Sequence, residues 1–134
     1  MKKVLVTGGS HAEFPMIQSL KELGFYVITT GSNADGIGHR LADKYIQGDY
    51  SDKEFIYGLA KEECVDAMVS GCNDFAYLST AYACEKLGLK GHDTYQNAEL
   101  VHHKDSFRKL VASLGIRTPE MISCSNLDEI RIAA

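Results

Sequence analysis

Several patterns that would point to common functions are missing from this chain of 134 residues. No apolar run approaches the roughly 20 residues that span a bilayer, and the apolar stretch near Met1 is too short for a signal peptide. No basic stripe is present and the net charge is −4, which argues against nucleic acid as a partner. We therefore expect a cytoplasmic protein that binds neither a membrane nor nucleic acid.

The cysteines and histidines also lack the spacing of a metal site. The four cysteines form no Cys-x-x-Cys pair and no His-Glu-x-x-His occurs, so we expect no metal ligands. Without a secretory signal, free thiols in a reducing cytoplasm are expected. The adjacent His102 and His103 are more typical of a solvated helix face than of a metal site. We interpret Cys72 as a small buried or partly buried residue, because no histidine can be placed beside it as a base.

Strand and helix patterns alternate through the first two thirds of the chain. Strands are predicted at 3–7, 25–30, 44–47, 65–70 and 89–91, and helices at 12–23, 38–42, 53–62 and 75–87. This alternation predicts an α/β fold with right-handed crossovers. We expect a doubly wound, mostly parallel five-stranded sheet, in the order 3-2-1-4-5, with helices on both faces.

The pattern changes after residue 93. Helices are predicted at 97–103 and 104–114, then an extended segment around Pro119, a strand at 121–124 and a helix from Leu127. That last helix is short and marginal without a partner, so we expect the protein to continue beyond it. We therefore predict one domain over residues 1–93 and a C-terminal helix–strand extension over 94–134.

Two loops are candidate binding sites because they follow the carboxyl ends of neighbouring strands in this topology, where such sheets bind ligands. In the first, Gly8, Gly9 and Ser10 could bring backbone N–H groups close to an anion, or could only form a tight turn. In the second, Asn73 and Asp74 could hydrogen-bond a polar ligand, or could equally cap the next helix. We expect the two loops to face each other across a crevice.

Two common nucleotide motifs do not fit the first loop. A dinucleotide fingerprint starting at Gly8 would need glycines where Ser10 and Glu13 stand, and an acidic residue just after Thr30, where Gly31 stands. No Gly-x-x-x-x-Gly-Lys-Ser/Thr sequence occurs either, which excludes a P-loop. Both absences argue against a dinucleotide or a P-loop nucleotide as the ligand of this loop.

Short motifs spread along the chain together resemble one enzyme family. They are Val-Leu-Val-Thr-Gly-Gly-Ser at 4–10, Ala-Asp-Lys-Tyr at 42–45, Gly-Asp-Tyr at 48–50, Val-Asp at 65–66, Leu-Gly-Leu-Lys-Gly at 87–91, Lys-Asp-x-Phe-Arg at 104–108 and Leu-Gly-Ile-Arg-Thr-Pro at 114–119. In this order and spacing they resemble the N-terminal portion of ATP-grasp ligases. The branch they resemble most is that of the carbamoyl-phosphate-synthase-like and carboxylate–amine ligases.

The resemblance implies a Rossmann-like pre-ATP-grasp domain over 1–93, with linker helices and the start of a truncated ATP-grasp domain over 94–134. Enzymes of this family use ATP to phosphorylate a carboxylate, and an amine then displaces the phosphate. The loops would hold a small-molecule substrate that bears a carboxylate or phosphate, through Gly8, Gly9, Ser10, Asn73 and Asp74. Lys104 matches the lysine that contacts the ATP phosphates.

The resemblance also limits what the chain could do by itself. ATP and magnesium are implied for the complete enzyme, whose second lysine, glycine-rich loop and magnesium ligands are not in this sequence. We therefore expect the chain alone to be inactive as a ligase. The alternative is a stand-alone Rossmann-like module that binds a nucleotide or nucleotide-sugar. An apolar face without a partner would favour a homodimer.

Overall fold

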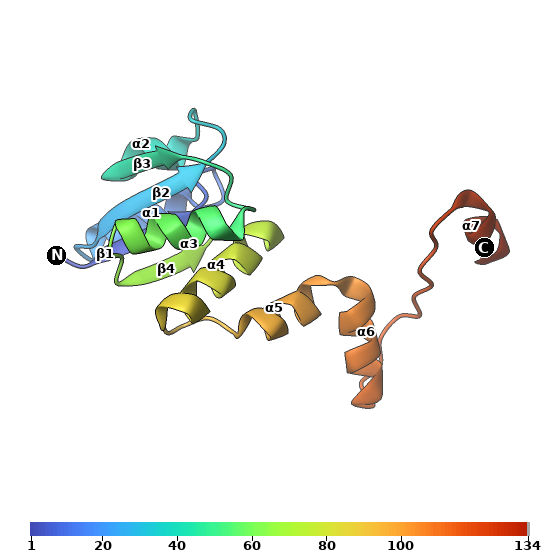
Figure 1. The fold of residues 1–134 in the computed structure, drawn as a ribbon. Helices are drawn as coiled ribbons and strands as arrows, with labels where there is room; N and C mark the ends of the chain where they lie inside the picture. The colour runs from blue at the N-terminus through green and yellow to red at the C-terminus, as the bar shows by residue number, and fades with distance from the viewer. Residues whose placement is uncertain (134) are drawn as a thin grey trace. The chain divides into compact units, whose positions relative to one another are not determined.

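The computed structural model describes residues 1–133 (Figure 1). Its strands are β1 (Lys3–Thr7), β2 (Tyr26–Gly31), β3 (Lys44–Gln47) and β4 (Ala67–Ser70), and its helices are α1 (Phe14–Glu22), α2 (Ile37–Leu41), α3 (Lys53–Glu62), α4 (Asp74–Leu87), α5 (Tyr95–His102), α6 (Lys104–Ser113) and α7 (Leu127–Ala133). The chain forms two compact units, Met1–Ala98 and Glu99–Ala134.

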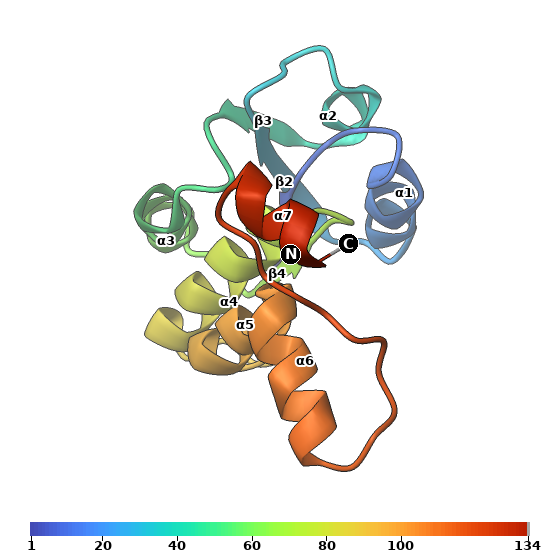
Figure 2. The ribbon, with the colours of Figure 1, turned by 90° about the vertical axis from the view of Figure 1, so that its right-hand side faces the viewer.

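The first unit is an α/β layer structure built on a parallel sheet. The strands are ordered β3-β2-β1-β4, and the central strand β1 pairs in parallel with both neighbours. Figure 2 shows α1 and α3 on opposite sides of this sheet. The predicted α/β class, the parallel sheet and the helices on both faces are confirmed.

Alternating side chains of β1 divide the core between the two faces. Leu5 packs on the side of α3 and α4 with Ile28 and Ile56. Val4 and Val6 point to the other side and pack against Ile17 of α1. Burying a side chain of this size stabilises the fold by about 1.5–3 kcal/mol. Packing on both faces therefore holds the sheet in place.

The predicted fifth strand at 89–91 does not form, and the sheet has four strands instead of five. Helix α4 ends at Gly88 in a left-handed conformation, and the main-chain N–H of Leu89 donates to the Cys84 carbonyl at 2.9 Å. Gly91 also has a positive φ, and the His92 ring donates to the Met68 carbonyl of β4 at 3.2 Å. The chain after α4 therefore turns, and the His92 side chain contacts β4. The backbone of residues 89–91 does not pair with a strand.

Two helix starts in this unit follow their sequence signals. Asp52 caps α3 by accepting hydrogen bonds from the main-chain N–H groups of Glu54 and Phe55, at 3.0 and 3.1 Å. Pro15 lies in the first turn of α1, where a missing N–H group costs no helical hydrogen bond.

The second unit contains α6 and α7, whose residues are all at least partly exposed. The predicted strand at 121–124 does not form, because the described residues of this unit provide no second strand for it to pair with. The assignment of this unit to linker helices and the start of an ATP-grasp domain stays a prediction. None of the helices within residues 1–133 is both long and apolar enough to cross a membrane.

Candidate functional site

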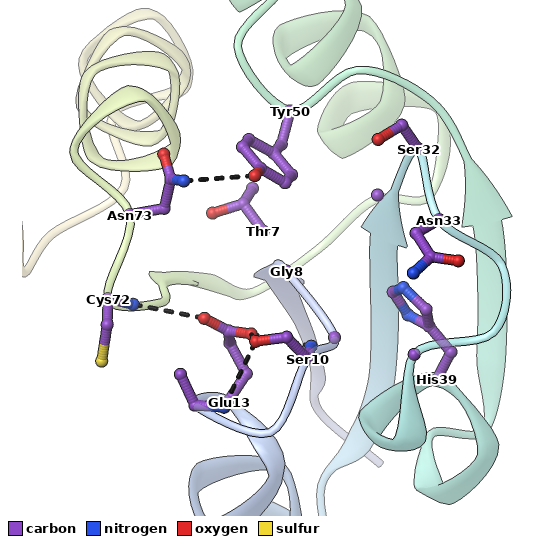
Figure 3. Close-up of a pocket in the computed structure, with 14 residues that line it drawn as sticks. Thr7, Gly8, Ser10, Glu13, Ser32, Asn33, His39, Tyr50, Cys72 and Asn73 are labelled. Carbon is purple, nitrogen blue, oxygen red and sulfur yellow. Dashed lines mark hydrogen bonds between the residues drawn. The ribbon is translucent and has the colours of Figure 1, made fainter.

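A pocket of about 250 Å³ opens in the first unit at the carboxyl ends of β1 and β2 (Figure 3). The glycine loop after β1 and the loop after β4 both line it, as the topology predicts. The other lining residues come from the end of β2, the loop after it, α2 and the loop after β3, and they are Gly31, Ser32, Asn33, Gly36, His39 and Tyr50. Parallel α/β sheets bind ligands at this edge, so the pocket is the candidate site.

The structure brings most, but not all, of the predicted site residues together. Gly8, Gly9, Ser10 and Asn73 line the pocket. Asp74 is the exposed first residue of α4 and is not among the residues that line it. Lys104 is the exposed first residue of α6, in the second unit. Whether each of these residues contacts a ligand stays a prediction.

The glycine loop packs tightly against its surroundings. Gly8 has a φ of 141°, which side-chain-bearing residues rarely adopt, and its N–H donates to the Thr30 carbonyl at 3.0 Å. A Cβ atom on Gly9 would lie 2.0 Å from Cε1 of His39. Glycine is therefore needed at Gly9 for close packing, while at Gly8 it is needed for the backbone conformation.

Glu13 is the residue that ties the two loops together. Its side chain leaves the turn before α1, and only 5% of the residue is exposed. Its Oε2 atom accepts from the Ser10 main-chain N–H at 2.8 Å and from the Ser10 hydroxyl at 2.6 Å. Its Oε1 atom accepts from the main-chain N–H of Cys72 at 3.3 Å. One carboxylate thus joins the loop after β1 to the loop after β4.

The charge of Glu13 is set by these contacts. Burial alone would raise the pKa of the carboxyl, but the hydrogen bonds from the Ser10 side chain, the Ser10 backbone and the Cys72 backbone outweigh it and lower the pKa. The carboxylate is consequently ionised at neutral pH.

Sequence analysis treated Glu13 only as a missing glycine, although a signal for its role was present. Ser10 and Glu13 have the Ser-x-x-Glu spacing of a capping box, in which the glutamate side chain reaches back to the N–H of the serine. The contact between Glu13 and the Ser10 N–H matches the glutamate half of this motif, although Ser10 itself is not the N-cap of α1, which begins at Phe14.

His39 of α2 is a second pocket residue that sequence analysis did not identify. It is 8% exposed, its Nδ1 lies 2.9 Å from the Thr29 hydroxyl, and its ring centre lies 4.2 Å from that of Tyr45. Burial lowers the pKa of the ring by more than the Glu13 charge and the Asn33 backbone raise it. The imidazole is therefore neutral at neutral pH.

Asn73 has a structural function that sequence analysis left as one of two alternatives. Its Oδ1 atom accepts from the N–H groups of Phe75 and Ala76, at 2.9 and 3.3 Å, and so caps α4. Its Nδ2 atom donates to the Tyr50 hydroxyl at 3.2 Å. The cap is confirmed, and the amide also holds a tyrosine at the pocket.

Asn73→Ala is expected to lower the free energy of unfolding by about 1 kcal/mol, because the first turn of α4 loses its cap. Asn73→Asp keeps a capping oxygen and loses only the donor to Tyr50, so its stability should stay within about 0.5 kcal/mol of the unchanged chain. Urea unfolding measures both changes. Equal losses in the two variants would contradict a capping function.

Cys72 is exposed, whereas burial or partial burial was predicted. Its main-chain N–H is turned inward to Glu13, and Figure 3 shows the thiol pointing away from that carboxylate. All four cysteines lie within the described residues and are free thiols. In the same part of the chain, no three histidine, cysteine or acidic side chains come together as a metal site.

Comparison with known proteins identifies the fold through solved structures alone. No protein-family model matches the chain, and no curated protein sequence is similar to it. Phosphoribosylglycinamide synthetase from Anaerococcus prevotii is 24% identical with a TM-score of 0.82, and the match covers 98% of this chain and 34% of that one.

Two carboxyaminoimidazole synthetases give similar results. The N5-carboxyaminoimidazole ribonucleotide synthetase from Thermotoga maritima is 23% identical with a TM-score of 0.76, over 99% of this chain and 36% of that one. The N5-carboxyaminoimidazole synthetase from Staphylococcus aureus, in complex with ADP, is 20% identical with a TM-score of 0.79. This match covers 98% of this chain and 34% of that one. This chain spans about a third of the length of the solved proteins that it matches. Those proteins are ATP-grasp enzymes, and the chain has the fold of their N-terminal portion.

Proposed function

We propose that this chain is the substrate-side N-terminal domain of an ATP-dependent carboxylate–amine or carbamoyl-phosphate-synthase-like ligase. The observation that carries the proposal is the fold match, which covers 98% of this chain and 34% of a phosphoribosylglycinamide synthetase. The pocket at the glycine loop would hold a small-molecule substrate, with Gly8, Gly9, Ser10 and Asn73 at its wall and Asp74 beside it.

ATP would bind elsewhere than in this pocket. Transfer of a phosphoryl group requires metal ions and cationic side chains that clamp it. None of the described residues that line the pocket is a lysine or an arginine, and its one ionised side chain, Glu13, is an acid. The pocket therefore does not fit a magnesium-bound triphosphate. Lys104 is exposed at the start of α6 and would contact the ATP phosphates within the complete enzyme.

The second unit supports this proposal over a stand-alone nucleotide or nucleotide-sugar module. Helices α6 and α7 bury none of their residues. Several large apolar side chains of this unit are exposed, namely Leu114, Ile116, Ile122, Leu127, Ile130 and Ile132. Exposed apolar side chains in such number are typical of a surface that is covered by further protein, here by the remaining ATP-grasp domain or by a second copy.

The 134-residue chain alone is expected to release no phosphate from ATP and magnesium with a panel of carboxylates and amines. The physical reason is the missing cationic clamp. A coupled phosphate assay measures this, with buffer lacking protein as the control. Carboxylate-dependent phosphate release would contradict the proposal. Saturable binding of a nucleotide-sugar by calorimetry, without turnover, would favour the stand-alone module.

A further inference from the structure

We propose that the pocket recognises its ligand by an amino group placed at the Glu13 carboxylate, and that it discriminates against an anionic group at this point. The inference rests on the proposed function in one respect, because it takes the pocket as the substrate site. It then assigns the amine substrate, instead of a carboxylate or phosphate group, to the glycine loop.

The anion position of the glycine loop is already occupied by the chain itself. A glycine loop binds an anion through N–H and hydroxyl groups that point toward it. Here the Ser10 N–H and hydroxyl both donate to Oε2 of Glu13, and the Cys72 N–H donates to Oε1. A ligand carboxylate or phosphate would have to displace Glu13 to use these donors.

The charge that remains at the pocket is negative and has no counter-charge. Glu13 takes part in none of the ion pairs formed by residues 1–133. The described lining residues contribute no lysine or arginine, and His39 is neutral. A buried carboxylate that is held by hydrogen bonds alone favours a cation and repels an anion.

Glu13 also keeps an acceptor position for a ligand. Its Oε2 atom accepts two hydrogen bonds, both from Ser10, whereas Oε1 accepts one, from the Cys72 N–H. Oε1 is therefore the oxygen with more capacity for a further donor. Figure 3 shows this carboxylate between Ser10 and Cys72, with the Tyr50 hydroxyl and Asn73 at the same pocket. An ammonium group at Oε1 would donate a hydrogen bond there and balance the charge.

The experiment compares three small probes of nearly equal size, which are glycinamide (cationic), glycolamide (neutral) and glycolate (anionic). The main-chain amide signals of Ser10 and Cys72 are followed by NMR in the 134-residue chain while each probe is added at constant ionic strength. We expect glycinamide to shift these signals in the millimolar range, and to bind about tenfold or more tightly than glycolate. Tighter binding of glycolate, equal binding of the three probes or no binding would overturn the inference.

Two single substitutions, one in the turn before α1 and one in α1 as a control, test whether the Glu13 charge is responsible for amine binding. Glu13→Gln should weaken glycinamide binding by about tenfold or more and remove the preference over glycolamide. Glu22→Gln makes the same change at an exposed residue of α1 and should leave binding unchanged. Unchanged glycinamide binding in Glu13→Gln would contradict the inference. If that variant does not fold, the order of the three probes on the unchanged chain still decides.

This outcome is separable from the proposed ligase function. The probes report the charge preference of the pocket without ATP, whereas the proposed function is tested by phosphate release and by nucleotide-sugar binding. Preference for glycolate would overturn the amine assignment and would leave the ligase proposal in place.

Discussion

Glu13→Ala is expected to lower the free energy of unfolding by about 2–4 kcal/mol. Hydrogen bonds to a charged acceptor contribute about 1.5–3 kcal/mol each. The loss should be smaller than the sum of three such bonds, because Ser10 and Cys72 are exposed residues whose freed donors can bond to water. Glu13 accepts three such bonds and joins the loop after β1 to the loop after β4. Its removal leaves the donors of Ser10 and Cys72 without their acceptor, so both loops should also loosen.

Urea unfolding at neutral pH measures this loss, and hydrogen exchange at the Ser10 and Cys72 amides locates it. Glu22→Ala, at an exposed position of α1, is the control and should change stability by less than about 0.5 kcal/mol. A loss of stability as small as that of the control would show that the carboxylate does not hold the two loops together.

The contribution of Glu13 to the free energy of unfolding should decrease as the pH falls. Because folding lowers the pKa of this carboxyl, its contribution is complete above its unfolded value of about 4.5 and is lost as pH falls through the lower folded value. Asp43 and Asp49 also have lowered pKa values. The difference in stability between the unchanged chain and Glu13→Gln therefore has to be compared at neutral and acidic pH. This difference should shrink in acid, and a constant difference would contradict the expectation.

The sequence predicted the parts of the fold that local patterns determine. Strands β1, β2 and β4 are mostly apolar or β-branched runs, and α3 and α4 begin at residues whose side chains cap them. The predicted strands at 89–91 and 121–124 failed for a different reason. A strand needs a partner backbone, and a run of three or four residues does not reveal whether one is available. Gly88 just before this first segment and Gly91 at its end both have positive φ and turn the chain instead.

The sequence predicted the position of the pocket, but it did not identify the side chain that bonds to the glycine loop. Strand order places the two loops at one edge of the sheet, so Gly8 and Asn73 could be identified from topology. The partner of the glycine loop is a side chain of the same chain, Glu13, and only the Ser-x-x-Glu spacing hinted at it. His39 could not be identified, because its place at the pocket depends on how closely α2 packs on Gly9 and Gly31.

Gly9→Ala is the second substitution for which we expect a large effect, a loss of about 3 kcal/mol in the free energy of unfolding. The added Cβ would lie 2.0 Å from Cε1 and 2.1 Å from Nδ1 of His39. The ring cannot easily move, because it is buried, hydrogen-bonded to Thr29 and packed against the tilted ring of Tyr45. Either the imidazole or the glycine loop must shift, and the pocket should change shape with it.

A matched variant and a double variant make this prediction specific to the contact. Gly58→Ala in α3 meets no atom within 4 Å and should be neutral or stabilising by about 0.5–1 kcal/mol, as expected for a glycine inside a helix. His39→Ala removes the obstructing ring, so Gly9→Ala should cost much less in that background than in the unchanged chain. Urea unfolding of the four-member cycle gives the coupling energy between the two sites. Strictly additive losses would show that the close approach of Gly9 and His39 is not what requires glycine at this position.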